Sequence, residues 1–239
     1  MMRNVSALTQ RELFASFFSP VAYVVATVFL VATGYLFLTE TLIGGREASV
    51  RPMLDGMATM LVFAVPLLTM RVLSEEFASG TIETLMTAPV TDIEVVFSKF
   101  LGVMVFYVAL LLTTIVHVIL LFVYGGAEPA VVVYGYIGMV LLGGLYVSVG
   151  VFASALTKHQ LVAAIIATCV LAILTVLVDG LAGWLGGDWR TALGYVNVLR
   201  HFGDFSKGIF DTRALVFFIS GTAFFLFLAV KVLESRRWR

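Results

Sequence analysis

Residues 71–99, RVLSEEFASGTIETLMTAPVTDIEVVFSK, form the one long polar interruption in the first half of an otherwise apolar chain. Each carboxylate in this segment would cost about 2.5–3.5 kcal/mol at the centre of a bilayer, so the segment must face water or a protein. Its five carboxylates are Glu75, Glu76, Glu83, Asp92 and Glu94. Ile82, Leu85 and Met86 recur at helical spacing between the charges, which predicts short amphipathic helices and not a flexible linker.

The composition is that of a polytopic membrane protein. Of 239 residues, 61% are hydrophobic and only 13% are charged, and the mean hydropathy is +1.05, well outside the range of soluble domains. The formal net charge is zero and no basic stripe is present, which argues against a nucleic-acid partner. The single cysteine, Cys169, lies in an apolar run, so one chain cannot form a disulfide framework or a cysteine metal site.

Stretches poor in charged residues predict six transmembrane helices, because about 20 apolar residues cross a ~30 Å hydrocarbon core. The predicted spans are residues 20–39, 54–73, 100–124, 130–156, 160–179 and 213–232. The second span can cross the membrane only if the Arg71 side chain extends its guanidinium to the membrane–water interface. Pro66 removes a backbone hydrogen bond from that span, which should therefore be buried against protein. Gly144 with Ser148, and Gly150 with Ser154, form two small-residue pairs on different faces of span four, which predicts two helix neighbours within the chain.

The two ends of the chain set the expected topology. Apolar and polar residues of 1–19 segregate as in a helix that lies in the membrane interface, and the apolar run that follows is too long for a cleaved signal peptide. With both termini in the cytoplasm, nine of the fifteen Lys and Arg residues lie inside, as in the C-terminal KVLESRRWR. We therefore expect a multi-pass protein of the inner (cytoplasmic) membrane, with residues 71–99 in the cytoplasm. Residues 180–212 then form an extracytoplasmic loop with short interfacial or re-entrant helices.

The spans offer little catalytic chemistry. His117 is the one ionisable residue deep in a span, and a proton relay there would need a carboxylate that no span centre supplies; a neutral histidine bonded to a carbonyl is the better interpretation. A hydrolase could be built from Ser148 with His117 or His201, but the spacing does not support it. The three histidines, at 117, 159 and 201, form no metal-ligand set. No catalytic or metal site is predicted.

Residues 74–102, SEEFASGTIETLMTAPVTDIEVVFSKFLG, resemble the corresponding stretch of ABC-2-type transporter permeases, in which Glu-Glu, Gly-Thr, Glu-x-Leu and Pro recur before the third span. Two further patches are similar to the same family, especially to its gliding-motility-associated branch: RELFASFFSPVAYVV at 11–25 and HFGDFSKGIFDTRALVFF at 201–218. The three patches occur in order from one end of the chain to the other.

The resemblance implies a non-enzymatic permease subunit, formed by residues 1–239 as a single transmembrane domain. The chain has no G-x-x-x-x-G-K-[ST] sequence, so ATP and Mg would bind on a partner ABC ATPase subunit, with no cofactor on this chain. Two permease chains, in a homodimer or heterodimer, would meet around a pathway in the lipid bilayer. A coupling helix between spans two and three would dock on the ATPase through Glu75, Glu76, Phe77, Gly80, Thr81, Ile82, Glu83, Leu85 and Pro89. Gly80 gives the backbone the freedom to form a turn, Thr81 can cap the helix that follows, and Pro89 can end that helix.

The expected fold is thus an all-α polytopic membrane protein with six transmembrane helices, an N-terminal interfacial helix and a cytoplasmic coupling helix. The expected function is ATP-driven export, because nothing resembles the binding-protein dependence of importers. The alternatives are an ABC-type mechanotransmission complex acting on an extracytoplasmic accessory protein and, in a different class, an ATP-independent secondary transporter. A gate or partner patch on the extracytoplasmic side is predicted at Phe202, Asp204, Phe205, Lys207, Gly208 and Asp211.

Overall fold

The computed structural model describes residues 2–41, 49–82, 90–124, 128–185 and 193–237, and all of its regular elements are helical. The elements are α1 (Met2–Phe17), α2 (Pro20–Leu36), the π-helical turn η1 (Phe37–Thr41), α3 (Arg51–Thr69), α4 (Ser74–Ser79), α6 (Asp92–Thr113), α7 (Ile115–Tyr124), α8 (Pro129–Leu156), α9 (Gln160–Ala172), the π-helical turn η2 (Ile173–Leu177), α10 (Val178–Leu185), α12 (Val198–Ser206) and α13 (Thr212–Arg237). The predicted all-α class is confirmed.

Six helical stretches are long and apolar enough to cross a membrane, as the sequence predicted. They are Pro20–Thr41, Arg51–Ser79, Asp92–Val123, Pro129–Leu156, Gln160–Leu177 and Thr212–Arg236. The second stretch contains two helices, because α3 ends at Thr69 and α4 begins at Ser74. Pro66 lies inside α3 and is buried with Val65 and Leu61, which confirms that this span packs against protein.

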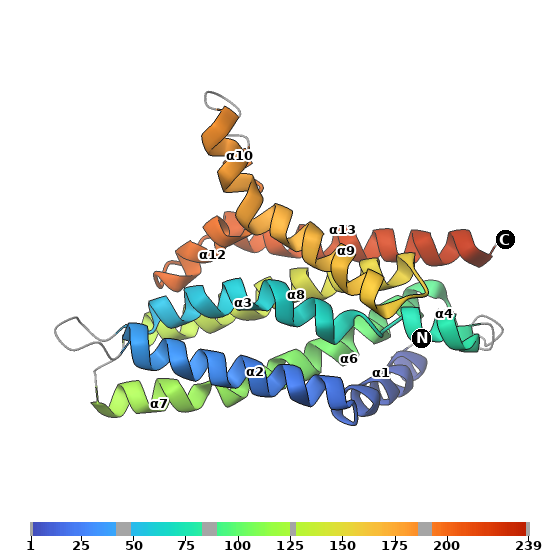
Figure 1. The fold of residues 1–239 in the computed structure, drawn as a ribbon, viewed down its shortest axis with the longest axis horizontal. Helices are drawn as coiled ribbons and strands as arrows, with labels where there is room; N and C mark the ends of the chain where they lie inside the picture. Colours follow the sequence, from blue (N-terminus) through green and yellow to red (C-terminus); the bar gives the residue numbers. More distant parts are fainter. Residues whose placement is uncertain (1, 42–48, 83–89, 125–127, 186–192, 238–239) are drawn as a thin grey trace.

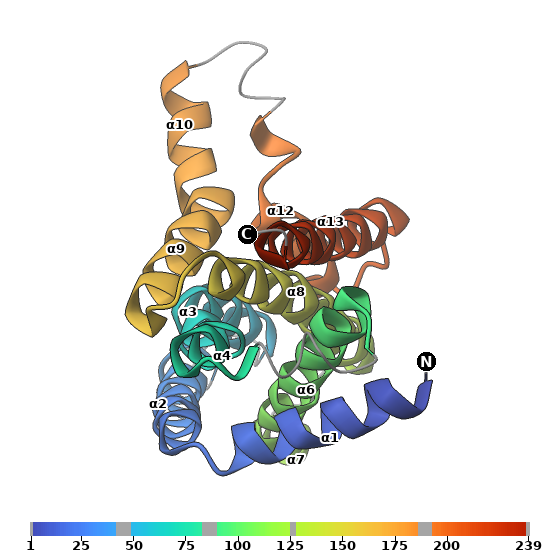
Figure 2. The same cartoon turned by 90° about the vertical axis from the view of Figure 1, so that its right-hand side faces the viewer.

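The long helices run side by side along one axis, and both termini lie with α4 at the same end of the bundle (Figure 1). α8 forms the centre of the bundle and contacts α3, α6 and α13 (Figure 2). Glycines allow these close contacts: a Cβ on Gly143 would collide with the ring of Tyr107 in α6, and one on Gly150 would collide with Thr69 in α3. Gly144 faces Thr222 of α13 instead. The two predicted small-residue pairs thus face different helices, but α8 has more helix neighbours than the two that the sequence predicted.

α1 runs across the bundle instead of along it (Figure 2). It crosses α6 at Gly102, where an added Cβ would lie 3.5 Å from the carbonyl carbon of Glu12. The rings of Phe17 and Phe106 pack edge to face, with centroids 5.1 Å apart. The N-terminal helix expected from the sequence is therefore present, and the apolar side chains of Phe14 in it and of Phe18 directly after it are exposed.

The segment between spans five and six contains short helices, as predicted. α10 leaves the bundle sideways (Figure 1), and the side chain of Trp184 on it is exposed. α12 returns to the bundle, and its first residue follows the N-cap Asn197, whose side-chain oxygen accepts from the Arg200 amide at 2.9 Å. The Asn197 amide nitrogen donates to the carbonyl of Thr175 at 3.0 Å, which anchors α12 to span five.

Candidate functional site

The corner between α3 and α4 is fixed to the central helix α8. The hydroxyl of Ser154 accepts hydrogen bonds from the amides of Leu73 and Ser74, at 2.9 and 3.0 Å, and donates to the carbonyl of Met70 at 3.1 Å. The first amides of a helix have no partner within it, so one buried hydroxyl satisfies two of these donors at the start of α4. The direction in which α4 leaves the bundle is therefore set by α8.

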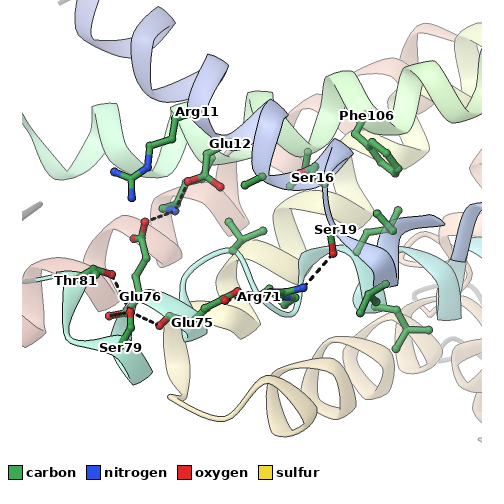
Figure 3. A pocket seen from close by; sticks show the side chains of 18 residues that line it. Arg11, Glu12, Ser16, Ser19, Arg71, Glu75, Glu76, Ser79, Thr81 and Phe106 are labelled. Atoms are coloured by element: carbon green, nitrogen blue, oxygen red, sulfur yellow. Dashed lines mark hydrogen bonds and ion pairs between the residues drawn. The ribbon is translucent and has the colours of Figure 1, made fainter. Parts of the chain in front are cut away.

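A buried lysine joins α4 to two other helices. Lys99 on α6 is 3% exposed, and its ammonium lies 2.7 Å from Oε1 of Glu12 on α1 and 2.8 Å from Oε1 of Glu76 on α4 (Figure 3). We call these three residues the Lys99 cluster. Burying an ammonium is costly unless carboxylates pair with it, so each side chain of the cluster depends on the others. The cluster connects residues that are 87 and 23 positions apart in the sequence.

A second ion pair lies beside the Lys99 cluster but is more exposed to solvent. Arg71 donates from Nε and Nη2 to both carboxylate oxygens of Glu75, at 2.9 and 3.1 Å, and from Nη1 to the hydroxyl of Ser19 at 3.0 Å (Figure 3). An exposed pair of this kind contributes about 0–1 kcal/mol. Its main effect is to orient the guanidinium toward the junction of α1 and α2.

α4 also contacts the last helix of the bundle. The guanidinium of Arg236 on α13 lies 4.3 Å from the ring centroid of Phe77, and its Nη2 donates to the carbonyl of Leu156 at 2.6 Å. This cation–π contact connects α4 to the end of α13. Helices α6, α8 and α13 therefore contact the six-residue helix α4, and α1 is joined to it through Lys99.

The predicted docking residues divide into two groups. Glu76, Phe77 and Ile82 point into the protein, whereas Glu75, Gly80 and Thr81 are exposed. Gly80 has φ of +74° and ends α4, which confirms the predicted turn, and helical backbone resumes at Thr81. The predicted residues Glu83, Leu85 and Pro89 lie outside the described residues.

Thr91 and Glu94, also in the 71–99 segment, have a structural function at the start of α6. The hydroxyl of Thr91 accepts from the Glu94 amide at 3.3 Å, and the Glu94 carboxylate accepts from the Thr91 amide at 2.9 Å. This reciprocal pair is a capping box, and the acidic side chains of Asp92 and Glu94 also suit the positive end of the helix dipole. The carboxylate of Glu94 therefore caps a helix.

Sequence reasoning missed Lys99 and Glu12. It counted Lys99 only among the Lys and Arg residues expected on the cytoplasmic side. A signal was present, because Val95, Val96 and Val103 place Lys99 on the buried face of α6 at three- and four-residue steps. A lysine on an apolar helix face needs a carboxylate partner, but the sequence offers many carboxylates and does not identify which ones come close.

The predicted extracytoplasmic patch needs a correction. Phe202 and Phe205 are 1% and 0% exposed and pack on Gly138 of α8, so they belong to the core of this chain and cannot offer a surface to a second one. The outer part of the patch is charged, with Asp204 3.9 Å from Lys207. Gly208 has φ of +76°, a left-handed conformation that glycine adopts without a steric penalty. The carboxylate of Asp211 accepts from the Arg213 amide at 2.8 Å, at the start of α13.

The candidate catalytic groups in the spans are bonded to backbone. Nδ1 of His117 lies 3.3 Å from the carbonyl oxygen of Thr114, which agrees with the interpretation of a histidine bonded to a carbonyl. Ser148 is buried and donates to the carbonyl of Leu145 at 2.7 Å, as expected of a serine that assists helix packing. Within the described residues, no group of three or more His, Cys, Asp or Glu side chains could hold a metal ion.

Comparison with known proteins identifies the family. A family model described as ABC-2 family transporter protein matches residues 2–189, which include α1, the first five spans and the α3–α4 corner. A comparison with curated proteins finds no match. Because the family model covers well over half of the 239 residues, the chain belongs to the ABC-2 family of transporter proteins.

Proposed function

We propose that this chain is the permease subunit of an ATP-binding-cassette exporter, and that a separate ATPase subunit docks on the exposed side of residues 71–99. Membership of the ABC-2 family supports the permease function. The absence of a phosphate-binding loop from the sequence supports a partner chain that binds ATP and Mg. A second permease chain completes the transporter, and the cytoplasmic end of the bundle is the one that holds α4 and both termini.

The Lys99 cluster is the observation that supports this proposal most. It joins α4, at the start of the docking segment, to α1 and to the beginning of span three with two ion pairs shorter than 3 Å. A movement of α4 is therefore transmitted to α6 and, through the same ammonium, to α1, whereas a flexible loop would not transmit it. Ser154 and Arg236 extend the same connection to α8 and α13.

The exposed residues of α4 provide the contact surface. Ala78, Ser79 and Gly80 are exposed at the end of the bundle, next to Thr81. The hydroxyls of Ser79 and Thr81 lie 2.9 Å apart, and the Glu75 carboxylate lies on the same exposed side. A short rigid helix with exposed polar side chains can bind in a groove on a water-soluble subunit.

Site-specific photocrosslinking tests the proposal. A benzophenone amino acid at Ala78, in the chain expressed in its own host, should crosslink to a protein that contains a phosphate-binding loop, as identified by mass spectrometry. The matched control is the same probe at Lys207, which is also exposed but lies beyond α12, near the start of α8. The proposal would be refuted if probes at Ala78, Ser79 and Thr81 all failed to capture an ATPase, or if Lys207 captured it equally.

A further inference from the structure

A partly open cavity of about 350 Å³ lies at the Lys99 cluster, lined by α1, the start of α2, the end of α3, α4 and α6. Its wall is of mixed character. Charged and hydroxyl side chains line it together with the apolar side chains of Val21, Leu67, Leu68 and Phe106. Its volume falls within the usual range for small-molecule sites, about 300–1,000 Å³.

The charges around the cavity balance, but Arg11 and one carboxylate oxygen of Glu76 have no partner among the described residues. Three cations and three carboxylates line it, and Arg71 and Lys99 are paired as described. Arg11 has no hydrogen bond or ion pair with any residue that the structure describes, and its side chain extends toward Glu12 and Glu76 (Figure 3). Oε2 of Glu76 is buried and likewise has no hydrogen-bond partner in the described part of the chain. A buried polar atom without a partner requires an explanation.

We propose that this cavity binds the headgroup of a zwitterionic phospholipid that carries a primary ammonium group. The lipid phosphate pairs with the guanidinium of Arg11, and the ammonium donates to Oε2 of Glu76. Guanidinium–phosphate pairs form two parallel hydrogen bonds, and both contacts are charge-assisted. The ligand thus supplies an anion to the guanidinium of Arg11 and a cation to Oε2 of Glu76, the two groups that have no other partner among the described residues.

The surroundings favour this lipid class over other phosphate compounds. An anionic lipid without an ammonium would add a net negative charge to a cavity whose own charges balance, and it would leave Oε2 of Glu76 without a partner. A free phosphate ester would not use the apolar side chains of the wall, of which Leu67, Leu68 and Phe106 can contact acyl chains. Phe18, at the junction of α1 and α2, is 80% exposed, which suits a position among lipids. The inference does not depend on the ATPase partner.

Native mass spectrometry of the purified chain, delipidated and mixed with defined lipids, tests the proposal. Dioleoyl phosphatidylethanolamine should be retained in preference to dioleoyl phosphatidylglycerol and dioleoyl phosphatidylcholine, the latter because a quaternary ammonium cannot donate a hydrogen bond to Glu76. Arg11→Gln should weaken retention of the ethanolamine lipid about tenfold or more, because it removes a charge-assisted contact. Arg213→Gln, an exposed residue at the start of α13, is the matched control and should leave retention unchanged.

Three outcomes would overturn the proposal. Equal retention by Arg11→Gln and the unaltered chain, with helicity by circular dichroism the same in both, would show that the arginine does not hold a phosphate. Equal retention of the glycerol and ethanolamine lipids would show a site for anions in general. Binding of glycerophosphoethanolamine as tight as that of the intact lipid would assign the cavity to a soluble ligand.

Discussion

Replacing Lys99 with methionine should strongly destabilise the protein. The ammonium lies on a side chain that is 3% exposed and pairs with Glu12 and Glu76, whose side chains are 17% and 14% exposed. Removing one partner of a buried ion pair costs roughly 3–5 kcal/mol, because the remaining charge stays out of water. The residual exposure of the two glutamates places the expected cost near the lower limit, at about 3 kcal/mol.

Thermal unfolding of the purified chain in detergent measures this cost. For a chain of this size, 1 kcal/mol corresponds to about 2–4 °C in Tm, so Lys99→Met should lower Tm by roughly 6–12 °C. Adding Glu12→Gln and Glu76→Gln to Lys99→Met should restore much of the loss, because neutral side chains of similar shape leave no unpaired charge.

The control is Lys231→Met, which removes an ion pair of the same length in a different environment. Lys231 lies 2.7 Å from Glu234, but the two side chains are 54% and 38% exposed, so the pair should contribute about 0–1 kcal/mol. If Lys99→Met and Lys231→Met shift Tm by the same amount, burial does not determine the energetic contribution of the Lys99 cluster and the reasoning is wrong.

Two further predictions concern packing and topology. Gly143→Ala should destabilise the bundle by about 1–3 kcal/mol, because the new methyl group collides with an aromatic ring on α6, whereas Gly183→Ala on α10, with open space around it, should cause no loss of stability in the same unfolding assay, since alanine favours helix more than glycine does. In a Cys169→Ala background, an impermeant maleimide applied to intact cells should label a cysteine at Lys207 but not one at Ala78, since we expect α4 in the cytoplasm; the opposite labelling would reverse the proposed orientation.

The sequence alone determined the number and approximate limits of the spans. Crossing a membrane requires an uninterrupted apolar helix of about 20 residues, and this requirement can be counted along the chain. The same is true of the turn at Gly80, where the structure has φ of +74°. A positive φ is a local property of the backbone that glycine adopts without a steric penalty, so the sequence indicates it directly.

Only the tertiary structure decided which polar groups meet and which aromatic residues are buried. Lys99 selects Glu12 and Glu76 from the carboxylates of the chain because the crossing of α1 at Gly102 and the corner held by Ser154 bring both to the same face of α6. Phe202 and Phe205 are buried for a similar reason, since Gly138 leaves room for them on α8. Hydropathy reports that a residue avoids water, but the neighbour that shields it depends on how distant helices pack, and that geometry is not encoded in any local pattern.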